Sequence, residues 1–461
     1  MRNIRTILKI CAWFTCMQIL IASCKTPHQL SHKVVVSPDV IPSENIYTTP
    51  VLATLPTAVV EVVKAKPIQQ ISWQEQKKQS LLTLLQDSLL LFSQVGLSVY
   101  DMTADSLILN YNADQRMRPA SCEKVVTAIS ALHFLGGDYL LRTQIRMTGS
   151  IKSDGTLDGD LYVIGGMDPM LSKVDVKQMA SALKQAGVKR IGGKMYIDVS
   201  MKDDNPLGWG WCWDDDYGPL TALTVDKKDS FTDEWLSALK DCKITVPVAA
   251  RTQAERVHID GVLLMPSSSS LKRAECPADA VVVAEITHTI DQLLQKMMKD
   301  SDNIYAESLF YQLASNSGAK KAGRKQAVVQ INALLDSLGV ASANYQIADG
   351  SGLSLYNYVS PSLLVTLLRY AYANEALRTH LLPSLPISGI DGTLKNRMKP
   401  DSPAYGVVKA KTGTVEGISS LSGYLTAKNG HVICFSFINQ GVAKGSLGRA
   451  FQDRVCEALV R

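Results

Sequence analysis

Residues 119–137 read Pro119-Ala-Ser-Cys-Glu-Lys-Val-Val-Thr-Ala-Ile-Ser-Ala-Leu-His-Phe-Leu-Gly-Gly137 and contain a well-marked helix signal. Apolar residues recur at helical spacing from Val125 to Phe134, and two glycines follow where a helix would end. The pattern predicts a buried helix that begins near Ser121. Ser121 then lies in the first turn, and Lys124 lies one turn further along the same side.

Further apolar patterns predict a sheet around this helix. Strands are expected at 95–102 and 107–111 before it, and at 407–413, 419–426 and 432–439 near the C-terminus, where Asn429-Gly430 predicts a hairpin turn. Helices are expected at 81–90, 284–300, 304–315, 360–373 and 446–460. These elements predict an α/β (α+β) fold in which helices cover both faces of an antiparallel sheet.

The middle of the chain has a different character. From about 145 to 290, short β-like runs alternate with turns rich in Gly and Asp, and one or two helices are expected, for example at 176–186. We therefore predict one domain formed by residues 72–144 and 288–461, split by a mostly β insertion at 145–287.

The N-terminus has the features of a targeting segment. Three basic residues (Arg2, Arg5, Lys9) precede an apolar run at 10–22, which is shorter than the ~20 residues that a membrane-spanning helix needs. The run ends in Leu20-Ile-Ala-Ser-Cys24, which resembles a bacterial lipobox and implies cleavage after residue 23 and lipid attachment to Cys24. The alternative is an ordinary signal peptide followed by an unrelated cysteine. Residues 24–71, rich in Pro, Ser, Thr and Val, are expected to be a flexible tether.

These features predict an exported, periplasmic protein that is lipid-anchored to a bacterial membrane.

Removing residues 1–23 lowers the net charge by three, from +5 to +2, and nothing indicates the concentrated basic face of a nucleic-acid-binding protein. No CxxC pair occurs, so a zinc site is not indicated, and no metal or organic cofactor is expected. Cys242 and Cys276 are candidates for a disulfide that the sequence cannot establish.

The first chemical motif is Ser121…Lys124. A serine hydroxyl is a poor nucleophile until a base removes its proton, and a lysine one helical turn away can do this if burial or a nearby cation lowers its pKa. The same spacing recurs elsewhere, for example from Ser181 to Lys184, so it is not specific by itself. The structural alternative is that Ser121 only caps its helix.

The second motif is Ser301-Asp302-Asn303, at the start of the helix expected at 304–315. Ser301 can pass a proton to a leaving amine, and the Asn303 amide can both donate and accept hydrogen bonds to a substrate peptide group. The structural alternative is a helix cap.

The third motif, Lys411-Thr412-Gly413, occurs once, at the end of an expected strand. Lys411 and Thr412 can hold a substrate carboxylate, and Gly413 allows a close approach of backbone or ligand. The backbone N–H groups of Thr414 and Ser121 would form an oxyanion hole. The alternative is an exposed strand end.

The three motifs, in this order, are those of penicillin-binding proteins and β-lactamases. The chain resembles the D-alanyl-D-alanine carboxypeptidase/endopeptidases, the low-molecular-mass class C penicillin-binding proteins of peptidase family S13. Other matching stretches run from about 75 to 460. They are Arg118-Pro-Ala-Ser121, Gly159-Asp-Leu-Tyr162, Gly165-Gly-Met-Asp-Pro169, Gly208-Trp-Gly-Trp211, Asp349-Gly-Ser-Gly-Leu-Ser354 and Gly392-Thr-Leu394 with Arg397.

This resemblance implies a transpeptidase-like domain with a penicillin-binding/β-lactamase-like fold, split by an insertion. It implies hydrolysis of the D-Ala-D-Ala bond of peptidoglycan stem peptides, and often of D-Ala–diaminopimelate cross-links, with covalent inhibition by β-lactams. It also makes Asp168 and Arg397 candidates for contacts to substrate side chains, although Asp168 could brace its turn and Arg397 could form a structural ion pair. The insertion is shorter than in the largest family members.

Two rival functions remain open from the sequence. A β-lactamase would differ only in fast deacylation of the penicilloyl-enzyme, and the insertion argues against it. A non-catalytic cell-wall-binding scaffold of the same fold would not need the motif residues, which are all intact.

Overall fold

The computed structural model describes residues 71–212, 215, 220–250, 257–259, 262–264, 271–319 and 321–461. The leader predicted at 1–23, Cys24 and nearly all of the tether predicted at 24–71 therefore lie outside the described residues. The described residues belong to one compact unit, which begins at Gln69.

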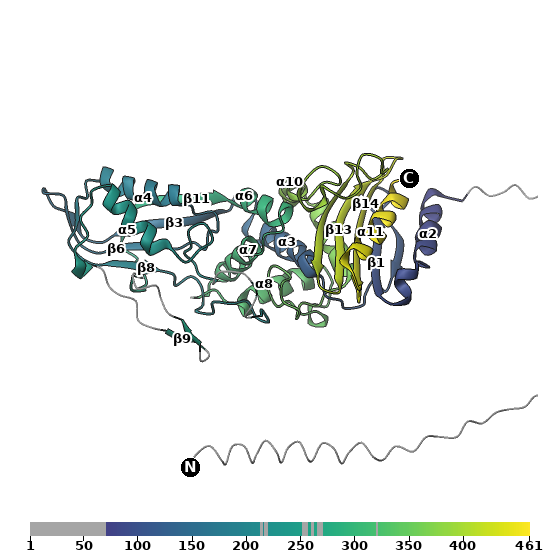
Figure 1. The fold of residues 1–461 in the computed structure, drawn as a ribbon, viewed down its shortest axis with the longest axis horizontal. Coiled ribbons are helices and arrows are strands. Elements are labelled where there is room, and N and C mark those ends of the chain that lie inside the picture. Colours follow the sequence, from purple (N-terminus) through teal and green to yellow (C-terminus); the bar gives the residue numbers. More distant parts are fainter. Residues whose placement is uncertain are drawn as a thin grey trace, which may run out of the picture. The chain divides into compact units, whose positions relative to one another are not determined.

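A five-stranded antiparallel sheet contains both the first and the last strands of the described chain (Figure 1). In space its strands run β12 (Val408–Val415), β13 (Ile418–Thr426), β14 (Val432–Gln440), β1 (Gln94–Asp101) and β2 (Ser106–Tyr111). β1 pairs with β14 along its whole length, from Gln94 opposite Gln440 to Asp101 opposite Ile433. Among the described strands, the first and the last in sequence are thus neighbours in the sheet.

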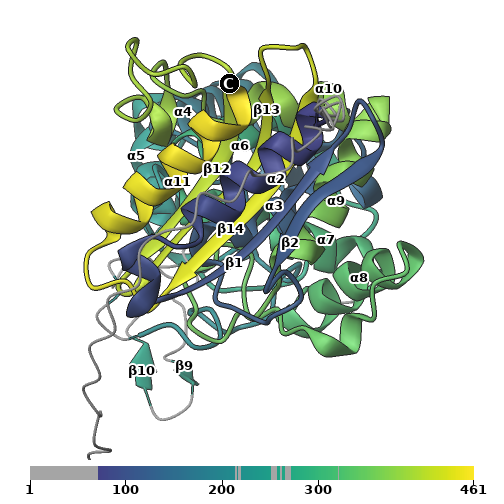
Figure 2. The same ribbon diagram turned by 90° about the vertical axis from the view of Figure 1, so that its right-hand side faces the viewer.

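Helices cover both faces of this sheet (Figure 2). On one face lie α2 (Trp73–Leu84) and α11 (Gly445–Val460), which enclose a buried cluster with Leu97, Phe435 and Phe451. On the other face lie α9 (Pro361–Ala373) and α3 (Glu123–Leu135). The predicted fold class, helices on both sides of an antiparallel sheet, is confirmed.

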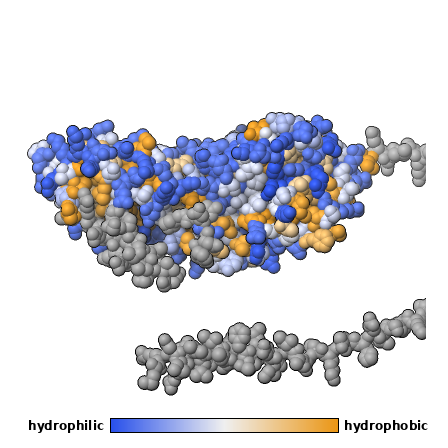
Figure 3. Space-filling view, viewed as in Figure 1, coloured by the Kyte–Doolittle hydropathy of each residue, from blue (hydrophilic) through white to orange (hydrophobic). Residues whose placement is uncertain are grey.

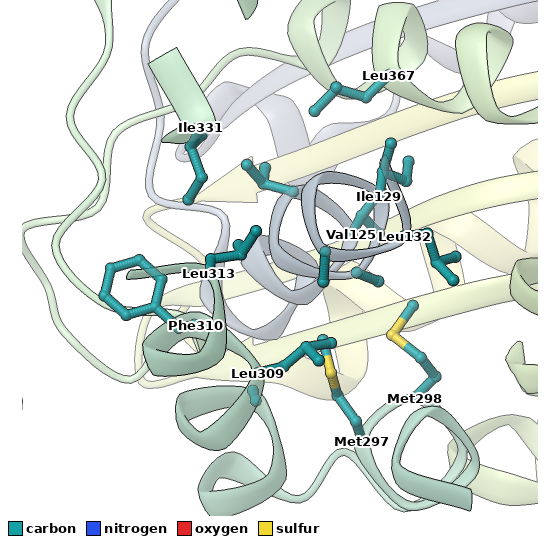
Figure 4. Packing of buried hydrophobic residues seen from close by; sticks show 14 of the residues in the cluster. Val125, Ile129, Leu132, Met297, Met298, Leu309, Phe310, Leu313, Ile331 and Leu367 are labelled. Atoms are coloured by element: carbon teal, nitrogen blue, oxygen red, sulfur yellow. The ribbon is translucent and has the colours of Figure 1, made fainter. Parts of the chain in front are cut away.

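Helix α3 is buried almost all round. Around it pack α7 (Asn303–Asn316), α8 (Arg324–Ser337), α9 and α10 (Glu375–Ser384). Figure 4 shows Val125, Ile129 and Leu132 of α3 among side chains of these neighbours, and all three are fully or almost fully buried. Replacing one such side chain by alanine costs typically ~2–5 kcal/mol, so this packing holds α3 firmly in place.

The inserted region forms a second sheet with the order β11 (Val281–Thr289), β3 (Leu140–Met147), β6 (Leu161–Ile164) and β8 (Met195–Asp198). Helices α4 (Lys173–Gln185) and α5 (Phe231–Asp241) share a separate core with it, in which Trp235 is fully buried. Two small sheets complete the region. They are β4 (Ser150–Ile151), β5 (Thr156–Asp158) and β7 (Arg190–Ile191), and the pair β9 (Val257–Ile259) and β10 (Val262–Leu264).

The helix expected at 284–300 is wrong in its first part. Residues 281–289 form strand β11, and helix follows only as α6 (Ile290–Leu294) and a π-helical turn at Gln295–Lys299. The segment is rich in β-branched residues, and β11 is an edge strand with only one neighbour, β3, among the described strands. Its side chains are largely exposed, so the apolar alternation that marks a half-buried strand is weak.

The surface shown in Figure 3 is mostly hydrophilic, with hydrophobic residues in small patches. Some apolar side chains are well exposed, among them Phe92 just before β1. Within the described ranges, no helix combines the length and the apolar character that crossing a membrane requires.

Candidate active site

Ser121 and Lys124 meet at the start of α3. Ser121 lies in a 3₁₀ turn, Ala120–Cys122, directly before the helix, and Lys124 is in the helix's first turn. The Lys124 ammonium lies 2.9 Å from the Ser121 Oγ, so nucleophile and base are in hydrogen-bond contact. Ser121 is half-buried, whereas Lys124 is fully buried. The predicted pairing of these residues on one side of the helix therefore holds in the structure.

The surroundings of Lys124 favour a neutral amine. Burial lowers the pKa of Lys124 from its usual value to about 8, although the nearby acids Asp349 and Glu307 oppose this shift. Glu307 is itself buried, and burial together with the charge of Asp349 raises its pKa to about 8. Burial also raises the pKa of the Glu123 carboxyl well above its usual range. A protonated carboxyl adds no negative charge, so the opposing effect of Glu307 on the pKa of Lys124 weakens when Glu307 is protonated.

The second motif comes from the start of α7. The Lys124 ammonium donates to Asn303 Oδ1 at 2.6 Å and to the backbone carbonyl of Ser351 at 2.8 Å. Asp302 caps α7 through its side chain, which accepts from the N–H groups of Ile304 and Tyr305. The capping role is thus taken by Asp302, which leaves Ser301 and Asn303 free to face Lys411 and Lys124.

The third motif lies on the edge strand β12. The Lys411 ammonium donates to Ser301 Oγ at 2.8 Å and to the Thr412 carbonyl at 2.6 Å. Burial and the neighbouring charge of Lys124 hold the pKa of Lys411 well below its usual range. Gly413 is needed for close packing, because a Cβ there would lie 2.6 Å from the Pro119 carbonyl oxygen and 2.2 Å from Ser420 Oγ.

These residues surround one pocket of about 310 Å³. Ser121, Ser301, Thr412 and Thr414 line it, together with Thr393, Arg397 and Arg449. Thr412 donates a hydrogen bond of 2.7 Å to Thr393. Five separate segments of the sequence therefore contribute to a single site.

The loop at 349–354 contacts the site, which the sequence did not predict. The Asp349 carboxylate accepts from the N–H groups of Gly352 and Ser354 and from the indole N–H of Trp211, at 2.7–2.9 Å. This network holds Ser351, whose carbonyl contacts Lys124. The recurrence of Gly and Ser after Asp349 was the available signal for a tight turn.

Arg397 and Asp168 occupy different places. Arg397 lines the pocket, but its side chain is 9% exposed and pairs with Asp453 at 2.7 Å, the structural ion pair that the sequence left open. Asp168 is buried outside the set of residues that line the pocket, with its carboxylate 2.5 Å from His288 Nδ1. It also accepts from the Met170 N–H, so it braces its own turn.

The six cysteines of the described residues are free thiols, so Cys242 and Cys276 are not paired in the structure. Cys122 is buried beneath the site, where its thiol donates to the Lys411 carbonyl at 3.2 Å. Its position agrees with a packing role rather than a chemical one.

A serine activated by a buried lysine, beside a Ser-Asp-Asn turn and a Lys-Thr-Gly strand, defines the penicillin-binding class of serine enzymes. The chain belongs to the D-Ala-D-Ala carboxypeptidase 3 (S13) family, whose model matches residues 77–232 and 245–460. The family resemblance inferred from the motifs is therefore confirmed.

Curated relatives and solved structures agree with this assignment. The chain is 29% identical over 423 residues to a D-alanyl-D-alanine carboxypeptidase DacB of Haemophilus influenzae, covering 77% of this chain and 87% of that protein. It is 28% identical over 453 residues to a D-alanyl-D-alanine carboxypeptidase of Actinomadura sp., covering 82% and 83%. The crystal structure of penicillin-binding protein 4 from H. influenzae superposes with a TM-score of 0.69 at 24% identity, covering 82% of this chain and 98% of that one.

Proposed function

We propose that this protein is a serine DD-peptidase that hydrolyses the D-Ala-D-Ala bond of peptidoglycan stem peptides through an acyl-enzyme on Ser121. The observation that carries this proposal is the 2.9 Å contact between Ser121 Oγ and a fully buried lysine whose pKa is lowered to about 8. The membership of the S13 family and the names of the relatives support the same substrate class.

In the acylation step, neutral Lys124 removes the proton of Ser121, and the Ser121 oxygen attacks the carbonyl carbon of the penultimate D-Ala. The backbone N–H groups of Ser121 and Thr414 stabilise the oxyanion, and Asn303 orients the substrate peptide. Ser301, in hydrogen-bond contact with Lys411, relays a proton to the leaving amine. Lys411 and Thr412 bind the terminal carboxylate, and water then hydrolyses the ester to regenerate Ser121.

β-Lactams should acylate the same serine, because their ring carbonyl and carboxylate imitate the substrate. A solved structure of the H. influenzae protein, with a TM-score of 0.63 to this chain, is a complex with a β-lactam. That relationship supports penicillin binding at Ser121 of this chain.

The decisive experiment is gel labelling with a fluorescent penicillin, comparing the mature protein with Ser121→Ala. A band that persists through washing and vanishes in the variant supports the acyl-serine mechanism. A band that decays within seconds points to a β-lactamase, and no band from a protein folded by circular dichroism points to the non-catalytic scaffold. Digestion of purified peptidoglycan then separates release of free D-Ala from cleavage of D-Ala–diaminopimelate cross-links.

We further propose that the protein is exported to the periplasm and lipid-anchored through Cys24. The support is the sequence of residues 2–24 alone, a basic start, a short apolar run and a lipobox-like ending. Metabolic labelling with a radioactive fatty acid tests this proposal. The wild-type protein should incorporate the label and sediment with membranes, and Cys24→Ser should do neither.

A further inference from the structure

One cation of the pocket has no part in the chemistry described above. Arg449 lies near the start of α11, is half-buried, and lines the pocket together with Ser121, Ser301 and Thr414. Arg449 Nη1 and Thr414 Cγ2 lie 3.2 and 3.3 Å from the same point, where a Cβ on Gly445 would be. The guanidinium is therefore next to the strand that is expected to receive the substrate.

Arg449 differs from its neighbours in lacking an acidic partner. Arg397 pairs with Asp453, and Arg454 on the same helix pairs with Asp87. In the described part of the chain, no carboxylate lies within ion-pair distance of Arg449, and no acidic residue lines the pocket. An arginine is always charged at physiological pH, so this one leaves the pocket with an uncompensated positive charge.

Lys411 alone is a poor candidate for the positive charge that would bind a carboxylate in the pocket. Its ammonium already donates to Ser301 and to the Thr412 carbonyl, and burial with the charge of Lys124 lowers its pKa. A lysine whose pKa is lowered is better suited to transferring a proton than to binding an anion as a permanent cation. A second cation that stays charged would strengthen the binding of a carboxylate in the pocket.

Arg449 is also held in position. The Arg397 Nη2 donates to the Arg449 carbonyl oxygen and to Gln452 Oε1, both at 3.2 Å. Arg397 thereby fixes the turn of α11 that carries Arg449, while its own Nη1 is buried without a hydrogen-bond partner among the described residues. Arg397 acts as a positioning residue for Arg449.

We propose that Arg449 determines substrate specificity by binding the free carboxylate of the residue that leaves after cleavage. The inference rests on the proposed function and deepens it, because it requires that the leaving residue carries an unmodified carboxylate. Substrates whose terminal carboxylate is amidated should then be poor.

The test compares two N-acylated tripeptides that differ only at the C-terminus, one ending in D-Ala-D-Ala carboxylate and the other in D-Ala-D-Ala amide. The wild-type enzyme should prefer the carboxylate. In Arg449→Ala, kcat/KM for the carboxylate should fall by about ten- to a hundredfold, mainly through KM, and kcat/KM for the amide should change little. Arg449→Lys should retain part of the preference, and Arg454→Ala is the matched control that should leave it intact.

Equal losses on both peptides in Arg449→Ala, or no loss on either, would overturn the inference. Hydrolysis of the amide by the wild-type enzyme as fast as the carboxylate would overturn it without any variant. These results differ from failure of the proposed function, in which the wild-type protein is not labelled by penicillin at Ser121.

Discussion

Asn303 accepts a hydrogen bond of 2.6 Å from the ammonium of Lys124, a residue 179 positions earlier in the chain. The same ammonium contacts Ser121, so one lysine joins the first two motifs. Its three hydrogen bonds, to Ser121, Asn303 and the Ser351 carbonyl, use all of its protons. A change in the charge of Lys124 therefore alters its hydrogen bonds to Ser121, Asn303 and the Ser351 carbonyl together.

The rate of acylation should follow the titration of Lys124. The neutral amine is the base, and its pKa is lowered to about 8, so the rate of penicillin acylation should rise with pH up to about 8 and then level off. Stopped-flow measurement of acylation across this range checks the prediction. Ser121→Ala corrects for spontaneous hydrolysis of the penicillin, and a flat profile between about pH 6 and 9 would contradict it.

The buried acid Glu307 should make stability depend on pH. Its pKa is raised to about 8 in the folded protein, so above its usual pKa the folded state binds more protons than the unfolded state. The free energy of unfolding should then fall as pH rises from about 4.5 to 8, by at most ~1.4 kcal/mol per pH unit from this group. Denaturant unfolding should show a weaker fall in Glu307→Gln, which cannot ionise. Identical pH dependence in both proteins would argue against the buried proton.

Gly413 should tolerate no side chain. A Cβ at this position meets the Pro119 carbonyl and Ser420, so Gly413→Ala should cost about 1–3 kcal/mol of stability and abolish or severely slow penicillin labelling. Gly430→Ala is a control for the steric contact, because a Cβ at Gly430 meets nothing within 4 Å, although Gly430 has a left-handed φ that Gly413 does not have. The control should lose about 1 kcal/mol at most and label normally. Thermal unfolding and gel labelling measure both effects.

The hydrogen bond between Trp211 and Asp349 should affect the rate of acylation, although neither residue lines the pocket. Trp211→Phe keeps an aromatic ring but removes the N–H that donates to Asp349 at 2.9 Å. The loop that presents the Ser351 carbonyl to Lys124 should loosen, and acylation should slow by about tenfold. The matched control is Trp209→Phe, since Trp209 is 45% exposed and its ring meets that of Tyr356 at a tilt of 49°. Equal acylation rates in the two variants would sink this prediction.

The parts of the fold with strong local patterns could be predicted from the sequence. Helix α3 and strands β12, β13 and β14 are buried, and their apolar spacing matches their secondary structure. Strand β11 lies at a sheet edge with largely exposed side chains, so its sequence pattern is ambiguous and predicts a helix instead of a strand. The spacing of apolar residues indicates secondary structure where one side of an element is buried. Most side chains of β11 are exposed or half-buried, so its spacing carries little information.

The site, too, could be predicted from the sequence only in part. Ser121 and Lys124 could be paired from their spacing on one helix, and the other motif residues from their order along the chain. The contacts of Lys124 with the Ser351 carbonyl, and its proximity to Glu307 and Asp349, depend on how distant segments pack. Arg449 was not found either, because an arginine on a surface helix carries no sequence signal until the pocket around it is known.

The pairing of β1 with β14 makes the five-stranded sheet depend on a single strand. β1 precedes the helix of Ser121 in the sequence, and β14 is the strand that joins it to β13 and so to β12, which carries Lys411. Without β14, the N-terminal part of the sheet would have no hydrogen-bonded link to the strand that holds Lys411. The two halves of the site are therefore held in register through a strand that contributes no residue to the pocket.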